Sequence, residues 1–283
     1  MNPARERLAV RGLRAKKSWG QNFLVDDTVV QRIAHAASLS RQDLVVEIGA
    51  GLGALTRALA AVAGRVVAVE RDADLVAVLR EDLAGETNVE VRAADALAFD
   101  IGAAARDHGG PVIVAGNLPY QITSPLLFHI LDAGAAVARA VLMVQREVAA
   151  RMSAPPGNKT YGRLSVMLQQ SAAVEALFHV PPGAFHPRPA VTSTVVRLTP
   201  RPAPLAFVAD PALFAQVVRE AFSTRRKMLR RSLEPAFGDA VLGAALASAG
   251  IDGRRRPETL AIVELARLAE GIARARRTAA VHA

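Results

Sequence analysis

The sequence contains no cysteine among its 283 residues. This absence excludes a disulfide framework, a metal site built from thiolates and a cysteine nucleophile. It also suits a protein of the reducing cytosol, where disulfides are rare. Any catalytic chemistry must therefore come from other residue types.

Long apolar runs are missing as well. A membrane-spanning helix needs about 18 or more consecutive apolar residues, whereas the run "GAAVARAVLMV" is shorter and is interrupted by Arg139. The basic N-terminus lacks the apolar core of a secretory signal. No internal repeat or low-complexity tract is visible. We therefore expect a soluble, cytoplasmic protein that acts as a monomer.

Positive charge is abundant but unevenly placed, with a net charge of +9 for the whole chain. Residues 1–17 hold six Lys or Arg and one Glu, and residues 219–283 hold thirteen basic and seven acidic side chains. Residues 18–218 are nearly neutral, with sixteen basic and eighteen acidic side chains. The basic ends are either ordinary solvated surface or polyanion-binding surfaces, because clustered Lys and Arg gain affinity by releasing phosphate counterions.

From Asp43 onward, apolar runs typical of strands alternate with amphipathic helical patterns. Helices are expected near 53–63 and 72–84, and the strand-like runs are 44–48, 65–70, 88–95, 111–117 and 140–145. This alternation predicts an α/β fold with a mostly parallel sheet and helices on both faces. Two further runs, 172–180 and 193–200, flank a proline-rich segment and predict a hairpin that ends the sheet.

The C-terminal part has a different pattern, which is helical to the end of the chain. The expected helices are 211–222, 224–234, 239–249 and 257–270. The length exceeds the usual size of one domain, and 51% hydrophobic residues allow a substantial core. We therefore expect an α/β domain over residues 1–204, including the basic N-terminal arm, and a small all-helical domain over 205–283.

The stretch "VVEIGAGLGALTRAL" runs from an expected strand into an expected helix. Gly49, Gly51 and Gly53 allow a tight turn and a close approach of the backbone to a ligand. With Ala54 at the third position, the loop also fits the fingerprint of dinucleotide sites. S-adenosylmethionine and NAD are therefore both candidate cofactors at this point.

Three carboxylates lie at or near the C-terminal ends of the expected strands of this region. Glu70, nineteen residues after Gly51, can accept hydrogen bonds from both ribose hydroxyls of either cofactor. Asp95 can accept from the exocyclic amine of adenine, with helix capping or an ion pair as the alternative. Glu47 points toward the glycine loop, where a buried carboxylate needs partners such as backbone N–H groups or a cofactor ammonium.

The strand "VIVAGN" runs into the tetrapeptide Asn117-Leu118-Pro119-Tyr120, at the sheet edge where open α/β sheets bind ligands. Methylation of the exocyclic nitrogen of adenine needs two acceptors for its hydrogens, because its lone pair is delocalised into the ring. The Asn117 side-chain oxygen and the Leu118 carbonyl can be these acceptors. Pro119 restricts the backbone, and Tyr120 offers a flat face for a stacked base. This chemistry needs no metal, and the sequence offers no obvious metal ligands.

The tetrapeptide resembles the signature of N6-adenine methyltransferases. The segments "KKSWGQNFLVD", "VVEIGAGLGALT", "VPPGAFHPRPAVTSTVVRL" and "AFSTRRKMLRRSL" resemble the rRNA adenine dimethyltransferase family over almost the whole chain, closest to its bacterial small-subunit members. The resemblance implies a class I, Rossmann-like methyltransferase that uses S-adenosylmethionine. It also implies that two adjacent adenosines in the loop of the 3′-terminal hairpin of 16S rRNA, in the 30S subunit or its precursor, each receive two methyl groups.

The resemblance further implies roles for individual residues. The implied cofactor contacts are Asn22, Leu24, Glu47, Gly49, Gly51, Glu70, Asp95 and Asn117. The implied catalytic residues are Asn117, Leu118, Pro119, Tyr120 and Phe185. Phe185 matches the second aromatic that would enclose a flipped adenine with Tyr120, although a lone Phe in such a loop more often packs in a core. Trp19, His186 and Arg188 depart from the family pattern, and the sequence assigns them no role.

A basic cluster lies in the expected helical domain. The candidate RNA-binding residues are Arg225, Arg226, Lys227, Arg230 and Arg231, and a spacing of three and four places several of them on one helix face. Arg254, Arg255 and Arg256 follow in a second cluster. An rRNA backbone suits both clusters, with a solvated helix surface as the alternative.

Three other functions stay open. The first is a 23S rRNA adenine methyltransferase of the antibiotic-resistance type, which shares the cofactor motifs. The second is a ribosome assembly factor without catalytic activity, although the tetrapeptide and Glu70 are intact. The third is an NAD-dependent oxidoreductase, which a cofactor-binding assay separates from a methyltransferase.

Overall fold

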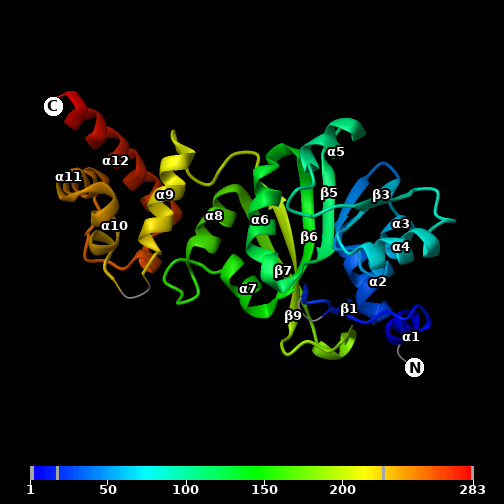
Figure 1. Cartoon of the computed structure of the whole chain (residues 1–283). Coiled ribbons are helices and arrows are strands. Elements are labelled where there is room, and N and C mark those ends of the chain that lie inside the picture. Colours follow the sequence, from blue (N-terminus) through cyan, green and yellow to red (C-terminus); the bar gives the residue numbers. More distant parts are fainter. Residues whose placement is uncertain (1–2, 17–18, 225–226, 282–283) are drawn as a thin grey trace. The chain divides into compact units, whose positions relative to one another are not determined.

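The computed structural model describes residues 3–16, 19–224 and 227–281. The chain forms two compact units, each of which has its own core (Figure 1). The sheet unit comprises Met1–Ala149 and Ala173–Pro200, and the helical unit comprises Ala150–Ala172 and Arg201–Ala283.

The two units differ from the division expected at residues 204 and 205. The segment Ala150–Ala172, which includes helix α8 (Arg163–Ser171), belongs to the helical unit. Its residues Tyr161 and Val166 share a buried cluster with Phe214 of the C-terminal region. The order of elements along the chain does not show in which core a helix will pack. The sequence therefore did not predict that this segment belongs to the helical unit.

The sheet unit is built on seven strands in the order β4-β3-β2-β5-β6-β9-β7. Their bounds are β2 (Leu44–Ile48), β3 (Arg65–Glu70), β4 (Val89–Ala93), β5 (Val112–Asn117), β6 (Val137–Gln145), β7 (Ala172–Val180) and β9 (Ser193–Pro200). The strands from β4 to β6 pair in parallel, and β9 pairs antiparallel with β6. This arrangement confirms the predicted mostly parallel sheet, and β7 and β9 are neighbours at its end, as expected.

Strand β2, in the middle of the parallel part of the sheet, is buried along its whole length. Val45 of β2 packs in a cluster with α2 (Asp27–Ala36) and α3 (Ala54–Ala60). Val46, which points to the opposite face, is equally buried. Burial on both faces is the pattern of a parallel sheet covered by helices on its two sides.

The other helices of the sheet unit are α1 (Pro3–Val10), α4 (Ala73–Asp82), α5 (Ile101–His108) and α6 (Thr123–Asp132), and α7 (Arg146–Met152) runs from this unit into the helical one. The expected helices at 53–63 and 72–84 are confirmed as α3 and α4. The Asp72 side chain caps α4 by accepting from the backbone N–H of Asp74, and this cap sets where the helix begins.

The helical unit contains α8 and four later helices, α9 (Pro211–Ala221), α10 (Leu229–Phe237), α11 (Asp239–Ala249) and α12 (Ile262–Val281). The last helix begins later than expected because Pro257 starts a separate short turn, Pro257–Thr259. Among the described residues, no helix combines the length and apolar character that crossing a bilayer requires.

The described part of the N-terminal arm, residues 3–16 and 19–24, packs against the rest of the sheet unit. Leu8 and Phe23 of the arm lie in a buried cluster with Leu75 of α4. The short strand β1 (Phe23–Leu24) pairs antiparallel with β8 (Phe185–His186), so Leu24 lies opposite Phe185. These contacts bring the arm to the C-terminal edge of the sheet.

Candidate active site

A pocket opens where strands β2, β3 and β5 end. About 950 Å³ of space there is not filled by atoms, and part of it is open to solvent. It is lined by Trp19, Gly20, Gln21, Asn22, Phe23, Ile48, Gly49, Gly51, Val69, Glu70, Arg71, Leu75, Ala94, Ala96, Asn117, Leu118, Pro119, Tyr120, Gln121 and Ile122. This is the edge at which open α/β sheets bind their ligands.

The glycine loop forms one wall of the pocket. Gly49 and Gly51 have φ values of 74° and 59°, in the left-handed region that favours glycine. A Cβ at Gly51 would lie 3.2 Å from the ring of Phe23. The loop backbone and the arm are therefore in close contact, and a side chain at Gly51 would crowd this wall.

Glu70 is held in place by backbone groups at the end of β3. Its Oε1 accepts from the N–H groups of Arg71 and Asp72, both at 2.9 Å, and its Oε2 accepts from Gly51 at 3.0 Å. A carboxylate oxygen can accept two hydrogen bonds, so Oε2 keeps one acceptor position. The position of Glu70 in the pocket wall therefore fits a hydroxyl of a bound ribose.

Glu47 lies beside the pocket rather than in its lining. Its side chain is 1% exposed. This burial raises its pKa to about 8. The negative charge of Glu70 also raises the pKa of Glu47, whereas the nearby Thr56 hydroxyl lowers it. The Oε2 atom of Glu47 has no hydrogen-bond partner of normal geometry. Its proposed contact with a cofactor ammonium stays a prediction.

Asn117 stands at the last position of β5. Its Nδ2 donates to the backbone carbonyl of Asn22 at 3.0 Å, which joins the strand end to the N-terminal arm. The next residue, Leu118, donates its N–H to the carbonyl of Met143 in β6 at 3.0 Å, and its side chain is buried. The Leu118 N–H and the preceding Asn117 side chain are therefore both held by hydrogen bonds, and the Leu118 side chain is held by burial.

The second half of the tetrapeptide is also held by hydrogen bonds. The Thr123 hydroxyl donates to the Pro119 carbonyl at 3.0 Å, as a short turn (Tyr120–Ile122) leads into α6. The Tyr120 hydroxyl lies 3.1 Å from the hydroxyl of Ser193, which is fully buried in β9. The Tyr120 ring thus lines the pocket in a defined position.

The structure brings most, but not all, of the predicted site residues to this pocket. Phe185 is 3% exposed and packs in the core cluster that contains α2 and α3. Asp95 lies just outside, between the lining residues Ala94 and Ala96, where it accepts from the N–H of Leu97 and pairs with Arg71 at 3.6 Å. Leu24 is likewise absent from the lining. The roles expected for these three residues stay predictions.

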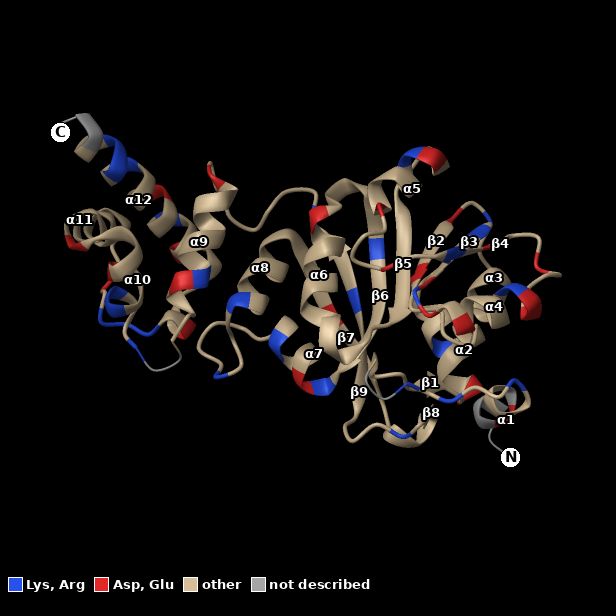
Figure 2. Cartoon of the chain, viewed as in Figure 1, with Lys and Arg blue, Asp and Glu red and all other residues tan. Residues whose placement is uncertain are grey.

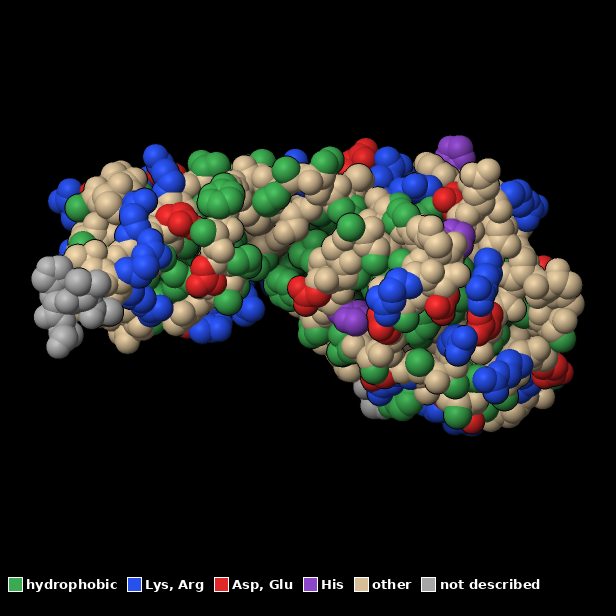
Figure 3. Space-filling model, turned by 90° about the horizontal axis from the view of Figure 1, so that it is seen from above, with side chains coloured by type: hydrophobic (Ala, Val, Ile, Leu, Met, Phe, Trp, Pro, Cys, Tyr) green, Lys and Arg blue, Asp and Glu red, His purple; other side chains and the backbone are tan. Residues whose placement is uncertain are grey.

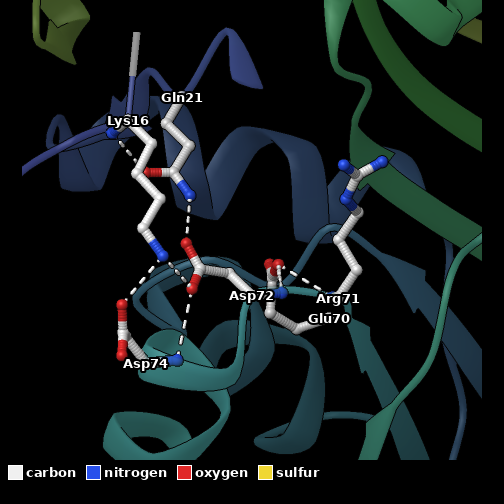
Figure 4. A network of polar contacts seen from close by, with 6 residues as sticks. All are labelled: Lys16, Gln21, Glu70, Arg71, Asp72 and Asp74. Carbon is white, nitrogen blue, oxygen red and sulfur yellow. Dashed lines mark hydrogen bonds and ion pairs between the residues drawn. The ribbon is translucent and has the colours of Figure 1, made fainter. Parts of the chain in front are cut away.

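Sequence reasoning missed three residues, Lys16, Gln21 and Asp72, of which Gln21 lines the pocket. Their side chains form a network of polar contacts between the N-terminal arm and the start of α4 (Figure 4). The motif "KKSWGQNFLVD" contains two of them, but nothing in the sequence shows that they share the carboxylate of Asp72. Trp19 also lines the pocket, with the Arg71 guanidinium 4.2 Å from its ring centre.

Of the predicted RNA-binding cluster, Arg225 and Arg226 lie outside the described residues. Lys227, Arg230 and Arg231 are all exposed, and Arg230 also pairs with Asp239 at 2.5 Å. In the second cluster, Arg254 pairs with Asp252 and Arg255 with Glu264. In Figure 2 the ribbon of α10 and its flanking loops is blue at Lys and Arg positions and red at acidic positions of the same region.

Comparison with known proteins identifies the family. The model of the family described as "Ribosomal RNA adenine dimethylase" matches residues 12–274, which is nearly the whole chain. The chain belongs to this family. The matched range contains the complete pocket lining and all helices from α2 to α11.

Several curated relatives of this chain have the same name. The "Ribosomal RNA small subunit methyltransferase A" of Anaeromyxobacter sp. (strain K) is 51% identical over 264 residues, covering 90% of this chain and 93% of the relative. The protein of the same name from Moorella thermoacetica is 48% identical over 264 residues, with coverages of 90% and 92%. These values confirm the resemblance that the sequence motifs indicated.

Two solved structures have the same fold over most of this chain. The 23S rRNA methyltransferase ErmE is 31% identical, with a TM-score of 0.68, and the match covers 89% of this chain and 99% of that one. A dimethyladenosine transferase from Plasmodium falciparum is 24% identical, with a TM-score of 0.76 and coverages of 90% and 98%. The predicted class I methyltransferase fold with a helical C-terminal part is confirmed.

Proposed function

We propose that this protein transfers methyl groups from S-adenosylmethionine to the N6 atoms of two adjacent adenosines in the loop of the 3′-terminal hairpin of 16S rRNA. Each adenosine receives two methyl groups, on the 30S subunit or its precursor, as a step of small-subunit biogenesis. The observation that supports this most directly is the tetrapeptide Asn117–Tyr120, which lines one pocket together with the glycine loop and Glu70.

The pocket residues fit the cofactor. Bound S-adenosylmethionine supplies a methyl group on a positively charged sulfur, which makes its carbon electrophilic. The free acceptor position on Glu70 Oε2 suits a ribose hydroxyl, and the close backbone of Gly49 and Gly51 suits the methionine part. Trp19 and Asn22 of the arm also line the pocket.

Asn117 and Leu118 orient the target nitrogen. Because Asn117 Nδ2 donates to Asn22, its Oδ1 is the end left to accept a hydrogen from the adenine amine. The Leu118 carbonyl accepts the second hydrogen. Two fixed acceptors favour a pyramidal nitrogen whose lone pair faces the electrophilic carbon, and alignment of this kind is a large part of the rate enhancement.

Tyr120 holds the base itself. Its ring faces the pocket and is fixed by the contact of its hydroxyl with Ser193. Stacking on an aromatic ring contributes about 1–3 kcal/mol per base, and an unpaired loop base is the least costly to swing out. Phe185 is buried in a core cluster, so it could stack on the other face of the base only after becoming exposed to the pocket.

The helical unit supplies contacts to the RNA backbone in this proposal. The candidates are Arg225, Arg226, Lys227, Arg230 and Arg231. In the described part of the chain Lys227, Arg230 and Arg231 are exposed, and Arg230 is paired with Asp239. Clustered basic side chains bind phosphates without reading sequence. The sheet unit then acts as the cofactor-binding catalytic domain, and the protein acts as a monomer in the cytoplasm.

One observation favours a second candidate, because ErmE is a 23S rRNA methyltransferase with 31% identity. The test is incubation with labelled S-adenosylmethionine and either 30S subunits that lack these methyl groups or protein-free 23S RNA. We expect label in 16S rRNA alone, with mass spectrometry locating dimethyladenosine in the 3′-terminal hairpin. Label in 23S RNA alone would refute the proposal, and so would binding of NAD in place of S-adenosylmethionine.

A further inference from the structure

The N-terminal arm is fastened to the sheet unit by a buried carboxylate. The Lys16 ammonium donates to Asp72 Oδ1 at 2.6 Å and to Asp74 Oδ2 at 2.8 Å, and the Gln21 amide donates to Asp72 Oδ2 at 2.7 Å (Figure 4). Asp72 is only 2% exposed, so water competes weakly for these bonds. We name the contacts of Lys16 and Gln21 with Asp72 the arm latch.

The arm latch is continuous with the candidate catalytic residue. Gln21 precedes Asn22, whose backbone carbonyl accepts from Asn117 Nδ2 at 3.0 Å. The backbone N–H of Lys16 also donates to Gln21 Oε1 at 2.8 Å, so both ends of the Gln21 amide are used. The position of the Asn22 carbonyl is therefore set by the latch immediately before it.

The amide of Asn117 has one donor end and one acceptor end, and only one orientation suits the Asn22 carbonyl. If the amide were turned over, two oxygens would face each other across the same contact. The arm thus selects the orientation in which Nδ2 faces Asn22 and Oδ1 is left for another donor. A looser arm would allow both orientations.

The latch is also connected to Glu70, the candidate ribose-binding residue of the pocket. The backbone N–H of Asp72 donates to Glu70 Oε1 at 2.9 Å, next to the side chain that holds the arm. One short segment, Glu70–Asp74, therefore holds the candidate ribose carboxylate, the start of α4 and the arm. Because Asp72 takes part in the bonds to Glu70 and in the bonds to the arm, Glu70 and the arm are held in a fixed position relative to each other.

We propose that Lys16, Gln21 and Asp72 are positioning residues, which fix the amide orientation of Asn117 through the carbonyl of Asn22. This inference rests on the proposed methyl transfer for its kinetic consequence. None of the three residues touches the target nitrogen. They act on the rate by keeping the acceptor oxygen of Asn117 aimed at the pocket.

Loss of the latch should be a local change, because other contacts hold the arm on both sides of it. Leu8 and Phe23 are buried against α4 and the glycine loop, and β1 pairs with β8. Arg11 binds Asp82 at the end of α4 at 2.6 Å. A substitution at Lys16, which is partly exposed, therefore loosens the arm between these anchors without unfolding it.

The matched variants are Lys16→Met and Arg11→Met. Each removes one positive charge of the arm that pairs with two carboxylates, but only Lys16 belongs to the latch. We expect Lys16→Met to slow single-turnover methyl transfer about tenfold to a hundredfold, because small misplacements of reacting groups have effects of this size. Cofactor affinity should change little, Arg11→Met should transfer methyl groups at the normal rate, and Lys16→Arg should recover most of the loss. Equal slowing by the two Met variants would overturn the proposal.

A double-mutant cycle tests the route through Asn117. In Asn117→Asp both ends of the side chain are oxygens, so its orientation no longer matters to the target amine. Lys16→Met should therefore cost little further rate in this background, although it costs much in the native one. Fully additive losses would show that the latch acts by another route and would overturn the proposal.

Hydrogen exchange of the free protein gives a readout that does not depend on activity. Backbone amides of residues 19–24 should exchange faster in Lys16→Met than in the native protein or in Arg11→Met. Unchanged exchange would overturn the latch itself. If the native protein fails to methylate 16S rRNA, the proposed function fails, but the exchange result still decides whether the latch exists.

Discussion

At the scale of single residues, the chemistry depends on side chains whose partners are fixed by the backbone around them. Asn117 and Glu70 each bind backbone groups of distant segments, and these bonds determine which of their atoms remain available. Glu47 differs, because one of its oxygens is buried without a partner. Two predictions follow from these surroundings.

Replacing Asn117 with Ala removes the acceptor for the target amine and leaves the glycine loop and Glu70 in place. We expect methyl transfer to fall about 100- to 1,000-fold, the range for losing one preorganised group of a transition state. Cofactor and RNA affinities should be nearly unchanged in equilibrium titrations. Tyr120→Phe is the matched control, since it keeps the stacking ring and should retain far more activity. Normal turnover by Asn117→Ala would exclude its positioning role.

Replacing Glu47 with Gln tests its raised pKa. The folded-state pKa of about 8 lies above the ordinary value of 4.5, so the folded protein binds this proton more tightly than the unfolded chain. The tighter proton binding therefore adds to the free energy of unfolding, and this contribution is fully present below pH 4.5. It is lost as the pH rises toward 8, by at most about 1.4 kcal/mol per pH unit. Glu47→Gln should therefore gain stability relative to the native protein between pH 5 and 8, as measured by urea unfolding. A constant difference across this range would contradict the prediction.

At the scale of elements, the pocket depends on how closely two strands approach. Gly116 of β5 lies against β2, and a Cβ at this position would be 2.4 Å from the backbone carbonyl oxygen of Ile48. Backbone atoms within a paired sheet cannot move aside as a side-chain tip can. The strand ends that bear Asn117 and the glycine loop therefore need glycine here.

Gly116→Ala should destabilise the sheet unit by about 1–3 kcal/mol or more, since this range is typical of overpacking. Thermal unfolding should show a lower Tm, and cofactor binding should weaken because the loop after β2 shifts. Gly85→Ala is the control, since nothing lies within 4 Å of a Cβ there. An unchanged Tm for Gly116→Ala would show that β2 and β5 do not approach so closely.

At the scale of the whole molecule, charge is the property that a large RNA partner would sense. The net charge is +9, and Figure 3 shows Lys and Arg side chains exposed on both units with Asp and Glu among them. In the helical unit several arginines are neutralised by ion pairs, such as Arg255 with Glu264. Exposed basic residues such as Lys227 and Arg231 are thus the better candidates for phosphate binding.

The double charge reversal Lys227→Glu with Arg231→Glu should weaken binding to 30S subunits. The slope of log affinity against log salt should become shallower by about one for each phosphate that the variant no longer binds. The charge reversal Arg106→Glu is the control for a non-specific effect of net charge, because Arg106 is an exposed residue of α5 in the sheet unit. Identical weakening at the two places, or an unchanged salt slope, would show that the cluster does not bind phosphates specifically.

Much of this molecule followed from local sequence patterns. The strands 44–48, 65–70, 172–180 and 193–200 have the predicted limits, because each is a strand-like run bounded by turn residues. Helix α2 and the pair β1–β8 were not predicted. A two-residue strand has no periodic pattern, and its partner lies about 160 residues away in the chain.

The candidate site divides in the same way. Glycines, an acidic strand end and an N-L-P-Y tetrapeptide are local features, since each requires particular residue types at fixed spacing, and the sequence by itself determined their presence and their family. Only the tertiary structure decided that Asp72 holds Lys16 and Gln21, that Phe185 is buried, and that the segment Ala150–Ala172 joins the helical unit. Those outcomes depend on which distant surfaces exclude water from one another, and spacing along a chain does not specify this.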